Sequence, residues 1–150
     1  MTAPATLFLE REFAAAPERV FAAFEDIGAW WSPAELKVVT AENDFRVGGR
    51  FRLVMAAPGS GLQVIVTGRY LEIERPRRLV FTHVFQGDDP WMHEVGLIDR
   101  DTRVEIELQA TAEGTRLTLT QSELPDAARE AIGGGWGGIL EGLAAYLRQA

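Results

Sequence analysis

The stretch that decides the fold is Ile132–Leu147, which reads IGGGWGGILEGLAAYL. Its apolar residues recur at the three- and four-residue spacing of one helical face. Six glycines weaken the same helix, each by about 0.5–1 kcal/mol relative to alanine in a helix interior. Such a helix must draw its stability from the surface against which it packs. The glycines either allow close packing on a sheet, with Trp136 as the buried anchor, or leave room beside the helix for a ligand.

The composition indicates one globular domain over residues 1–150. The chain has 150 residues, of which 47% are hydrophobic and 25% are charged, and a domain of this size can bury a substantial core without disulfides. It has no cysteine, which excludes thiolate metal sites and cysteine nucleophiles. The sequence shows no secretory leader and no stretch apolar enough to span a membrane, so a cytoplasmic location is expected.

The net charge of -7 is distributed along the chain without a basic block. A protein of this kind has no general electrostatic attraction for nucleic acid phosphates or for anionic lipid. We therefore expect neither nucleic acid nor a membrane surface as a partner.

Alternating apolar and polar residues predict short strands joined by turns. The expected strands cover residues 7–13, 36–40, 50–55, 62–73, 79–85, 103–111 and 115–120. Two short helices are expected after the first strand, from Pro17 and near residues 27–31, and one long helix over residues 125–149. Gly68 is expected to form a bulge or bend, because the apolar phase shifts beyond it. Residues 86–101 have no period, and we expect them to form a mobile rim outside the core.

This order of elements predicts an α+β fold. Strands joined by hairpin-like turns favour a curved antiparallel sheet of six to seven strands, and the sheet is expected to wrap around the long C-terminal helix. No linker, repeat or low-complexity segment divides the chain.

Short motifs follow one another along nearly the whole chain in the order of a known family. They are REF at 11–13, AAPERVF at 15–21, WW at 30–31, GGRF at 48–51, GRYLEI at 68–73, PRRLVFT at 76–82, TRLTLT at 115–120 and GW at 135–136. On these motifs the chain resembles the helix-grip superfamily of START, polyketide-cyclase and birch-pollen-allergen-like domains. It is most similar to the small bacterial domains related to the heat-shock chaperone ATPase activator. The resemblance implies the helix-grip fold, but this superfold hosts transport, cyclisation and chaperone regulation alike.

Two places depart from the family pattern. Many relatives have a tryptophan after the threonine of the fifth strand, whereas this chain has His83 after Thr82. The segment 86–101 is longer than the usual connection. Both departures fall where domains of this family often open their cavity.

His83 is the one candidate for chemistry. If it points inward, as its alignment with the family tryptophan implies, it is a titratable group at the cavity wall, and otherwise it is a core histidine with a hydrogen-bond partner. His93 and Glu94, with Asp99 and Asp101, offer imidazole and carboxylate groups. Adjacent residues rarely face one ion, however, so we expect no metal site. No cofactor is expected either.

Large apolar side chains from separate regions are expected to meet between the long helix and the sheet. The candidate ligand-binding residues are Phe24, Trp30, Trp31, Phe51, Leu53, Met55, Val66, Phe81, His83, Trp91, Trp136 and Leu140. A cavity lined by large aromatic residues and few polar groups suits a flat or apolar small molecule. A filled core would bury the same residues.

Three functions remain open at this stage. The first is binding of a hydrophobic small molecule between the C-terminal helix and the sheet, without covalent chemistry. The second is a cyclase- or hydratase-like enzyme, in which His83 or a nearby acid moves a proton. The third is a regulatory domain that binds a chaperone or sensor protein through its outer surface. Each is compatible with a monomer or a homodimer.

Overall fold

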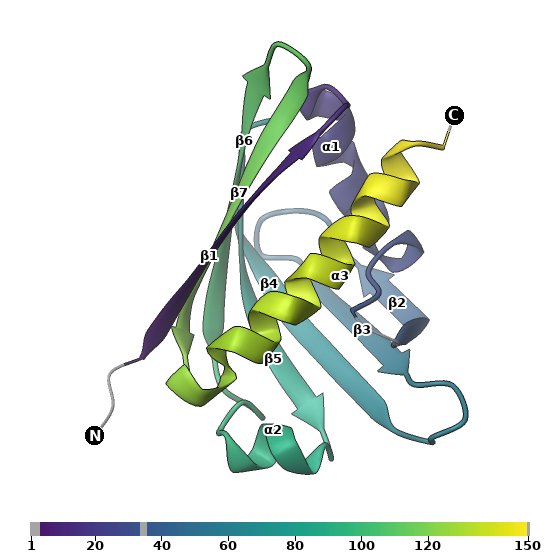
Figure 1. Cartoon of the computed structure of the whole chain (residues 1–150), viewed down its shortest axis with the longest axis vertical. Coiled ribbons are helices and arrows are strands. Elements are labelled where there is room, and N and C mark those ends of the chain that lie inside the picture. Colours follow the sequence, from purple (N-terminus) through teal and green to yellow (C-terminus); the bar gives the residue numbers. More distant parts are fainter. Residues whose placement is uncertain (1–3, 34–35, 150) are drawn as a thin grey trace.

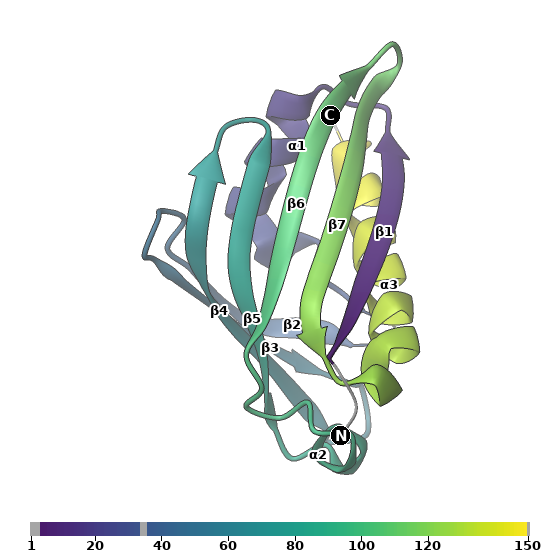
Figure 2. The same cartoon turned by 90° about the vertical axis from the view of Figure 1, so that its left-hand side faces the viewer.

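The computed structural model describes residues 4–33 and 36–149. Its described part contains a seven-stranded antiparallel sheet in the order β1-β7-β6-β5-β4-β3-β2. The strands are β1 (Ala5–Phe13), β2 (Lys37–Asn43), β3 (Arg50–Ala56), β4 (Gln63–Glu74), β5 (Arg78–Gly87), β6 (Thr102–Thr111) and β7 (Gly114–Leu124). The helix α3 (Arg129–Leu147) lies across one face of this sheet (Figures 1 and 2), which we call the inner face. The predicted α+β helix-grip fold is confirmed.

Period-two alternation explains why these segments form strands with one apolar face. In β7, Leu117 and Leu119 are fully buried, whereas Thr118 and Thr120 between them are only partly buried. Burial of the apolar residues along one face pins the register, because a slip of one residue would expose every one of them.

Two short helices connect β1 to β2, as the sequence predicts: α1 (Pro17–Ala23) and the 3-10 helix η1 (Phe24–Ala29). Arg19 of α1 reaches the far end of α3 and donates a hydrogen bond of 3.1 Å to the carbonyl oxygen of Leu147. The last carbonyls of a helix have no partner within it, so this contact caps α3 and joins the two helices.

The C-terminal helix differs at its start from the predicted range of residues 125–149. Asp126–Ala128 form a separate 3-10 turn, η2, and α3 begins at Arg129. Pro125 is extended, with φ −61° and ψ 135°, and no side chain caps the first turn of α3. The apolar face is buried as the spacing predicts, including Trp136. Among the described residues, no helix is long and apolar enough to cross a membrane.

The segment of residues 86–101 is more ordered than the sequence predicts. It contains the short helix α2 (Pro90–Glu94), whose first turn is capped by the Asp89 carboxylate accepting from the Met92 N–H at 3.0 Å. Leu97 is buried in the core at 1% exposure. The expectation that this whole segment lies outside the core was therefore wrong: Leu97 anchors it, and Met92 and Val95 pack against the core beside it.

The sequence also predicted the irregularity in β4 at the wrong residue. The register between β4 and β5 shifts between Tyr70 and Glu72, not at Gly68. A Cβ atom at Gly68 would stand 2.3 Å from a ring carbon of Phe51. The glycine therefore makes room for an aromatic ring of the neighbouring strand, and the change of phase occurs two residues later.

The glycines of α3 serve different purposes along the helix. A Cβ atom at Gly142 would stand 2.3 Å from the carbonyl oxygen of Trp30, so the helix touches the backbone after η1 at that point. At Gly135 the nearest atom would be Cβ of Pro33, at 3.8 Å. Nothing described lies within 4 Å of a Cβ atom at Gly137. Close packing thus accounts for Gly142 but not for Gly137.

We expect opposite effects from two matched substitutions in α3. Gly142→Ala should lower the free energy of unfolding by more than about 1 kcal/mol, because the added methyl group collides with a backbone oxygen. Gly137→Ala should raise it by about 0.5–1 kcal/mol, because alanine favours the helix and nothing obstructs it. Urea titration of both variants measures the difference, and equal effects at the two positions would contradict this account of α3.

Candidate functional site

The inner face encloses a small cavity between α3 and the sheet, with a volume of about 40 Å³. Its lining residues are Trp31, Pro33, Met55, Val66, His83, Phe85, Ile132, Gly135, Trp136 and Ile139. All of these except His83 are apolar residues or glycine. The cavity therefore forms where Gly135 leaves space beside the helix, which is the second role that the sequence left open for the glycines.

A second, smaller void of about 10 Å³ also borders Trp31. It is lined by Phe24, Ile27, Trp31, Phe51, Tyr70, Leu79 and Phe81. Tyr70 donates to the side-chain oxygen of Asn43, and burial raises the pKa of its hydroxyl well above the usual range. Trp31 is the one residue that lines both cavities among those described.

The structure brings together many of the predicted ligand-binding residues. Those beside the first cavity are Trp31, Met55, Val66, His83 and Trp136, and those beside the second are Phe24, Trp31, Phe51 and Phe81. Trp30, Leu53 and Leu140 are buried in the same core but line neither cavity. Trp91 lies on α2, is 39% exposed and lines neither cavity.

A buried chain of hydrogen bonds links α3 to the sheet beside the first cavity. The Trp136 indole N–H donates to Oε1 of Gln121 at 2.8 Å, and Nε2 of Gln121 donates to Oγ1 of Thr102 at 3.0 Å. The Thr102 hydroxyl donates to the backbone carbonyl of His83 at 2.5 Å. The Gln121 side chain, fully buried, is thus held in one orientation by groups from three elements.

This orientation assigns the tautomer of His83. Nε2 of Gln121 lies 3.4 Å from Nδ1 of His83, and an amide nitrogen can only donate, so Nδ1 is the acceptor. The proton of the neutral ring is then on Nε2. No hydrogen bond joins Nε2 to any residue in the described part of the chain, and no fully buried side-chain nitrogen there lacks a partner. Nε2 therefore keeps some accessible surface.

Aromatic rings surround the His83 imidazole. Trp31 stacks on it with 6.3 Å between ring centroids and 23° between planes, and Trp136 and Phe85 lie at 5.7 and 4.9 Å. Burial in this apolar setting lowers the pKa of His83 to about 4, because a charged ring would lose its hydration. The ring is neutral at physiological pH.

This site has few groups that could take part in a chemical reaction. His83 has no hydrogen bond to an acidic or basic side chain among the described residues. Nor does any group of three or more histidine, cysteine or acidic side chains in that part of the chain form a metal-binding set. The arrangement can enclose an apolar group and donate one hydrogen bond, and among the described residues that line the cavity His83 is the one titratable group.

Sequence reasoning missed Phe85, Ile132, Ile139, Gln121 and Thr102. The apolar spacing places Ile132 and Ile139 on the buried face of the long helix with Trp136, but they were not among the candidate ligand-binding residues. Phe85 follows His83 at the spacing of one strand face, so alternation could have placed it as well. Gln121 continues the inward alternation of Leu117 and Leu119, and a polar residue at such a position signals a buried network.

The comparisons with known proteins agree with this architecture. Residues 14–148 match the family model described as Activator of Hsp90 ATPase homolog 1-like protein. The chain belongs to this family. The resemblance found in the sequence is thereby confirmed. A search of curated proteins finds no match.

Solved structures support the same assignment. A protein from Chromobacterium violaceum is 31% identical, with a TM-score of 0.83, over 98% of this chain and 100% of that one. A protein from Silicibacter pomeroyi described as AHSA1 is 33% identical, with a TM-score of 0.78, over 95% and 97% of the two chains. A Mycobacterium smegmatis protein at 18% identity shares the fold, with a TM-score of 0.76 over 99% and 98%.

We expect His83 to make the stability of this activator-like domain depend on pH. Its pKa is about 4 in the folded state and 6.5 when unperturbed, so between these values the unfolded chain binds more protons and stability falls as the pH falls. The full difference corresponds to about 3 kcal/mol at low pH relative to neutral pH. Urea titrations from neutral pH to pH 4 measure it.

The second histidine provides the control. His83→Phe should remove most of the loss below pH 6.5, whereas His93→Phe should leave the loss unchanged, because His93 is exposed. If both variants keep the slope of the parent protein, His83 is not the group responsible.

Proposed function

We propose that this protein binds a small, mostly apolar molecule between α3 and the inner face of the sheet, through one hydrogen bond from Nε2 of His83. The observation that carries this proposal is the single imidazole in an otherwise apolar cavity, with Nδ1 already engaged by Gln121. Large apolar surfaces supply affinity in such sites, and a few polar groups set the orientation of the ligand.

The chemistry of the ligand follows from the state of His83. A neutral Nε2–H donor suits an uncharged acceptor such as a carbonyl, ether or hydroxyl oxygen. A carboxylate in the same place would be buried without a cation beside it, at a large cost in solvation. We therefore propose an uncharged ligand, bound without covalent chemistry.

The ligand needs more room than the closed cavity provides. The volume of about 40 Å³ lies well below the roughly 300–1,000 Å³ of small-molecule pockets. Trp31 lines both cavities, and we propose that a rotation of its ring joins them. The indoles of Trp30 and Trp136 are held by hydrogen bonds to Ala23 and Gln121, whereas no such bond holds Trp31 among the described residues. Trp31 is thus the proposed gate.

The two other functions have less support. An enzyme of the cyclase or hydratase kind needs a proton donor and a proton acceptor aligned on the substrate. Among the described residues, the ring nitrogens of His83 have the Gln121 amide as their one hydrogen-bond partner. For a protein partner, the exposed large hydrophobic residues Phe8, Val39, Val47 and Trp91 belong to separate elements or loops. A chaperone or sensor partner, the oligomeric state and a cytoplasmic location stay proposals without an observation of their own.

The first test uses Nile red, an uncharged dye with a carbonyl acceptor, with binding measured by its fluorescence at several pH values. Protonated His83 should exclude the dye, so the affinity should fall about tenfold per pH unit below the histidine pKa. His83→Phe should remove this dependence, and His93→Phe should not. Identical pH profiles for the parent and His83→Phe proteins would refute the role of His83.

The second test concerns the gate. Trp31→Ala joins the two cavities before binding, so the dye should bind more tightly at neutral pH because no ring has to be displaced. Trp91→Ala is the matched control, since its indole is exposed and lines neither cavity. Weaker binding by Trp31→Ala, with the fold intact by circular dichroism, would argue for Trp31 as a contact of the ligand instead of a gate. Native mass spectrometry of gently purified protein would identify a copurified ligand.

A further inference from the structure

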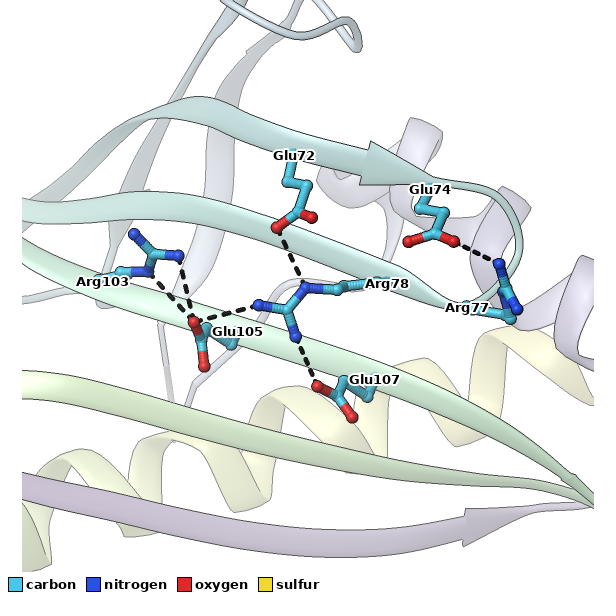
Figure 3. A network of polar contacts seen from close by, with 7 residues as sticks. All are labelled: Glu72, Glu74, Arg77, Arg78, Arg103, Glu105 and Glu107. Carbon is cyan, nitrogen blue, oxygen red and sulfur yellow. Dashed lines mark hydrogen bonds and ion pairs between the residues drawn. The ribbon is translucent and has the colours of Figure 1, made fainter.

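The outer face of the sheet carries two groups of arginines in different electrostatic settings. In the first, Arg78 of β5 contacts the carboxylates of Glu72, Glu105 and Glu107 on the strands at either side (Figure 3). Glu105 is shared with Arg103. These charges largely compensate one another, and each side chain of the network keeps at least 25% of its surface exposed, so the network serves as a partly solvated surface of the sheet.

The second group lies beside a shallow groove of about 770 Å³ on the same face. Arg50 and Arg69 are direct partners in the register between β3 and β4, and Arg52 follows Arg50 on the same face of β3. Thr82 lies next to Arg69, whose backbone N–H donates to its hydroxyl at 2.9 Å. Arg103 is the partner of Thr82 on β6, so the row Arg50, Arg69, Thr82 and Arg103 crosses four strands.

Within the described part of the chain, the arginines of β3 and β4 make no ion pair with an acidic side chain. The chain has 15 lysine and arginine residues, of which Lys37 is the one lysine, leaving 14 arginines. Ten of these 14 make an ion pair or a side-chain hydrogen bond with a described residue. The four that make none are Arg50, Arg52, Arg69 and Arg148. Three of them therefore line one groove.

This concentration of positive charge in the groove is unfavourable unless negative charge balances it. Like charges directly opposite each other in a sheet destabilise the pair, and Arg50 faces Arg69 in a chain whose net charge is -7. Acids do line the groove: Glu42 on β2, Asp101 before β6 and Glu123 at the end of β7. None of them lies within 4.0 Å of the guanidinium groups of Arg50, Arg52 or Arg69. Glu42 is the direct partner of Arg52 in the register between β2 and β3, so the positive charge is least compensated at the facing pair Arg50 and Arg69.

We propose that this groove binds a small multivalent oxyanion, with Arg50, Arg52 and Arg69 as the ligands. A guanidinium group matches the geometry of a carboxylate or a phosphate through two parallel hydrogen bonds. The Thr82 oxygen accepts from Arg69, so its own O–H is free to donate to an anion in the groove. The occupant is a phosphorylated or polycarboxylate small molecule, on the face of the sheet opposite the apolar cavity.

The experiment is a calorimetric titration of the full chain with pyrophosphate, and separately with citrate, at physiological ionic strength. We expect saturable binding of at least one of them, and the tighter of the two identifies phosphate or carboxylate chemistry. Arg69→Gln should weaken that binding about tenfold or more, the loss of one charge-assisted contact. Arg148→Gln is the matched control, because it removes the same charge from an arginine outside the groove that has no ion pair with a described residue, and it should change the affinity less than twofold.

Several results would overturn the proposal. One is the absence of saturable binding of both anions. Another is an equal loss of affinity in Arg69→Gln and Arg148→Gln, which would show a general response to net charge. Arg69 is exposed, so its variant should fold; circular dichroism checks this, and Arg50→Gln repeats the test from the opposite strand. Nile red binding by these variants should be unchanged, which separates this site from the apolar cavity.

Discussion

The hydrogen bond from the Trp136 indole to Gln121 is the contact on which the interior of this protein depends. It joins the middle of α3 to β7, and it determines which end of the Gln121 amide faces His83 and Thr102. Without it, a fully buried amide oxygen would lose its partner, at a cost of about 1–3 kcal/mol. One indole nitrogen therefore positions the helix and sets the hydrogen-bonding state of the only polar ring at the cavity.

The helix can rely on this contact because its own sequence does little to stabilise it. Glycines at 133–135, 137, 138 and 142 lower the helix propensity of α3, so most of its stability comes from the buried apolar face. The glycine positions also shape the surroundings. Gly142 permits contact with the backbone at Trp30, while Gly135 lies beside the cavity. Glycine thus allows close contact between the helix and a neighbouring backbone at one position, and leaves space beside the helix at another.

The sequence predicted the fold well and the site in part, for a physical reason. Alternation and helical spacing report which face of an element is buried, and this was enough for the sheet, for α3 and for the aromatic residues that meet at Trp31. Side-chain networks and void volumes depend on contacts between elements distant in sequence, so the pairing of Gln121 with His83 and the small size of the cavity had no local signal. Leu97 shows the same limit, because its burial depends on how the segment after α2 folds back.

The two faces of β5 differ in how their cationic groups respond to acid. Thr82 faces the arginines of the outer groove, and the next residue, His83, faces the cavity. Guanidinium groups keep their charge throughout the physiological range, whereas the imidazole changes its charge in acid. Acidification therefore alters the cationic charge of the inner face alone. The positive charge on the outer face of β5 is therefore permanent, whereas the charge on its inner face depends on pH, although the two faces belong to the same strand.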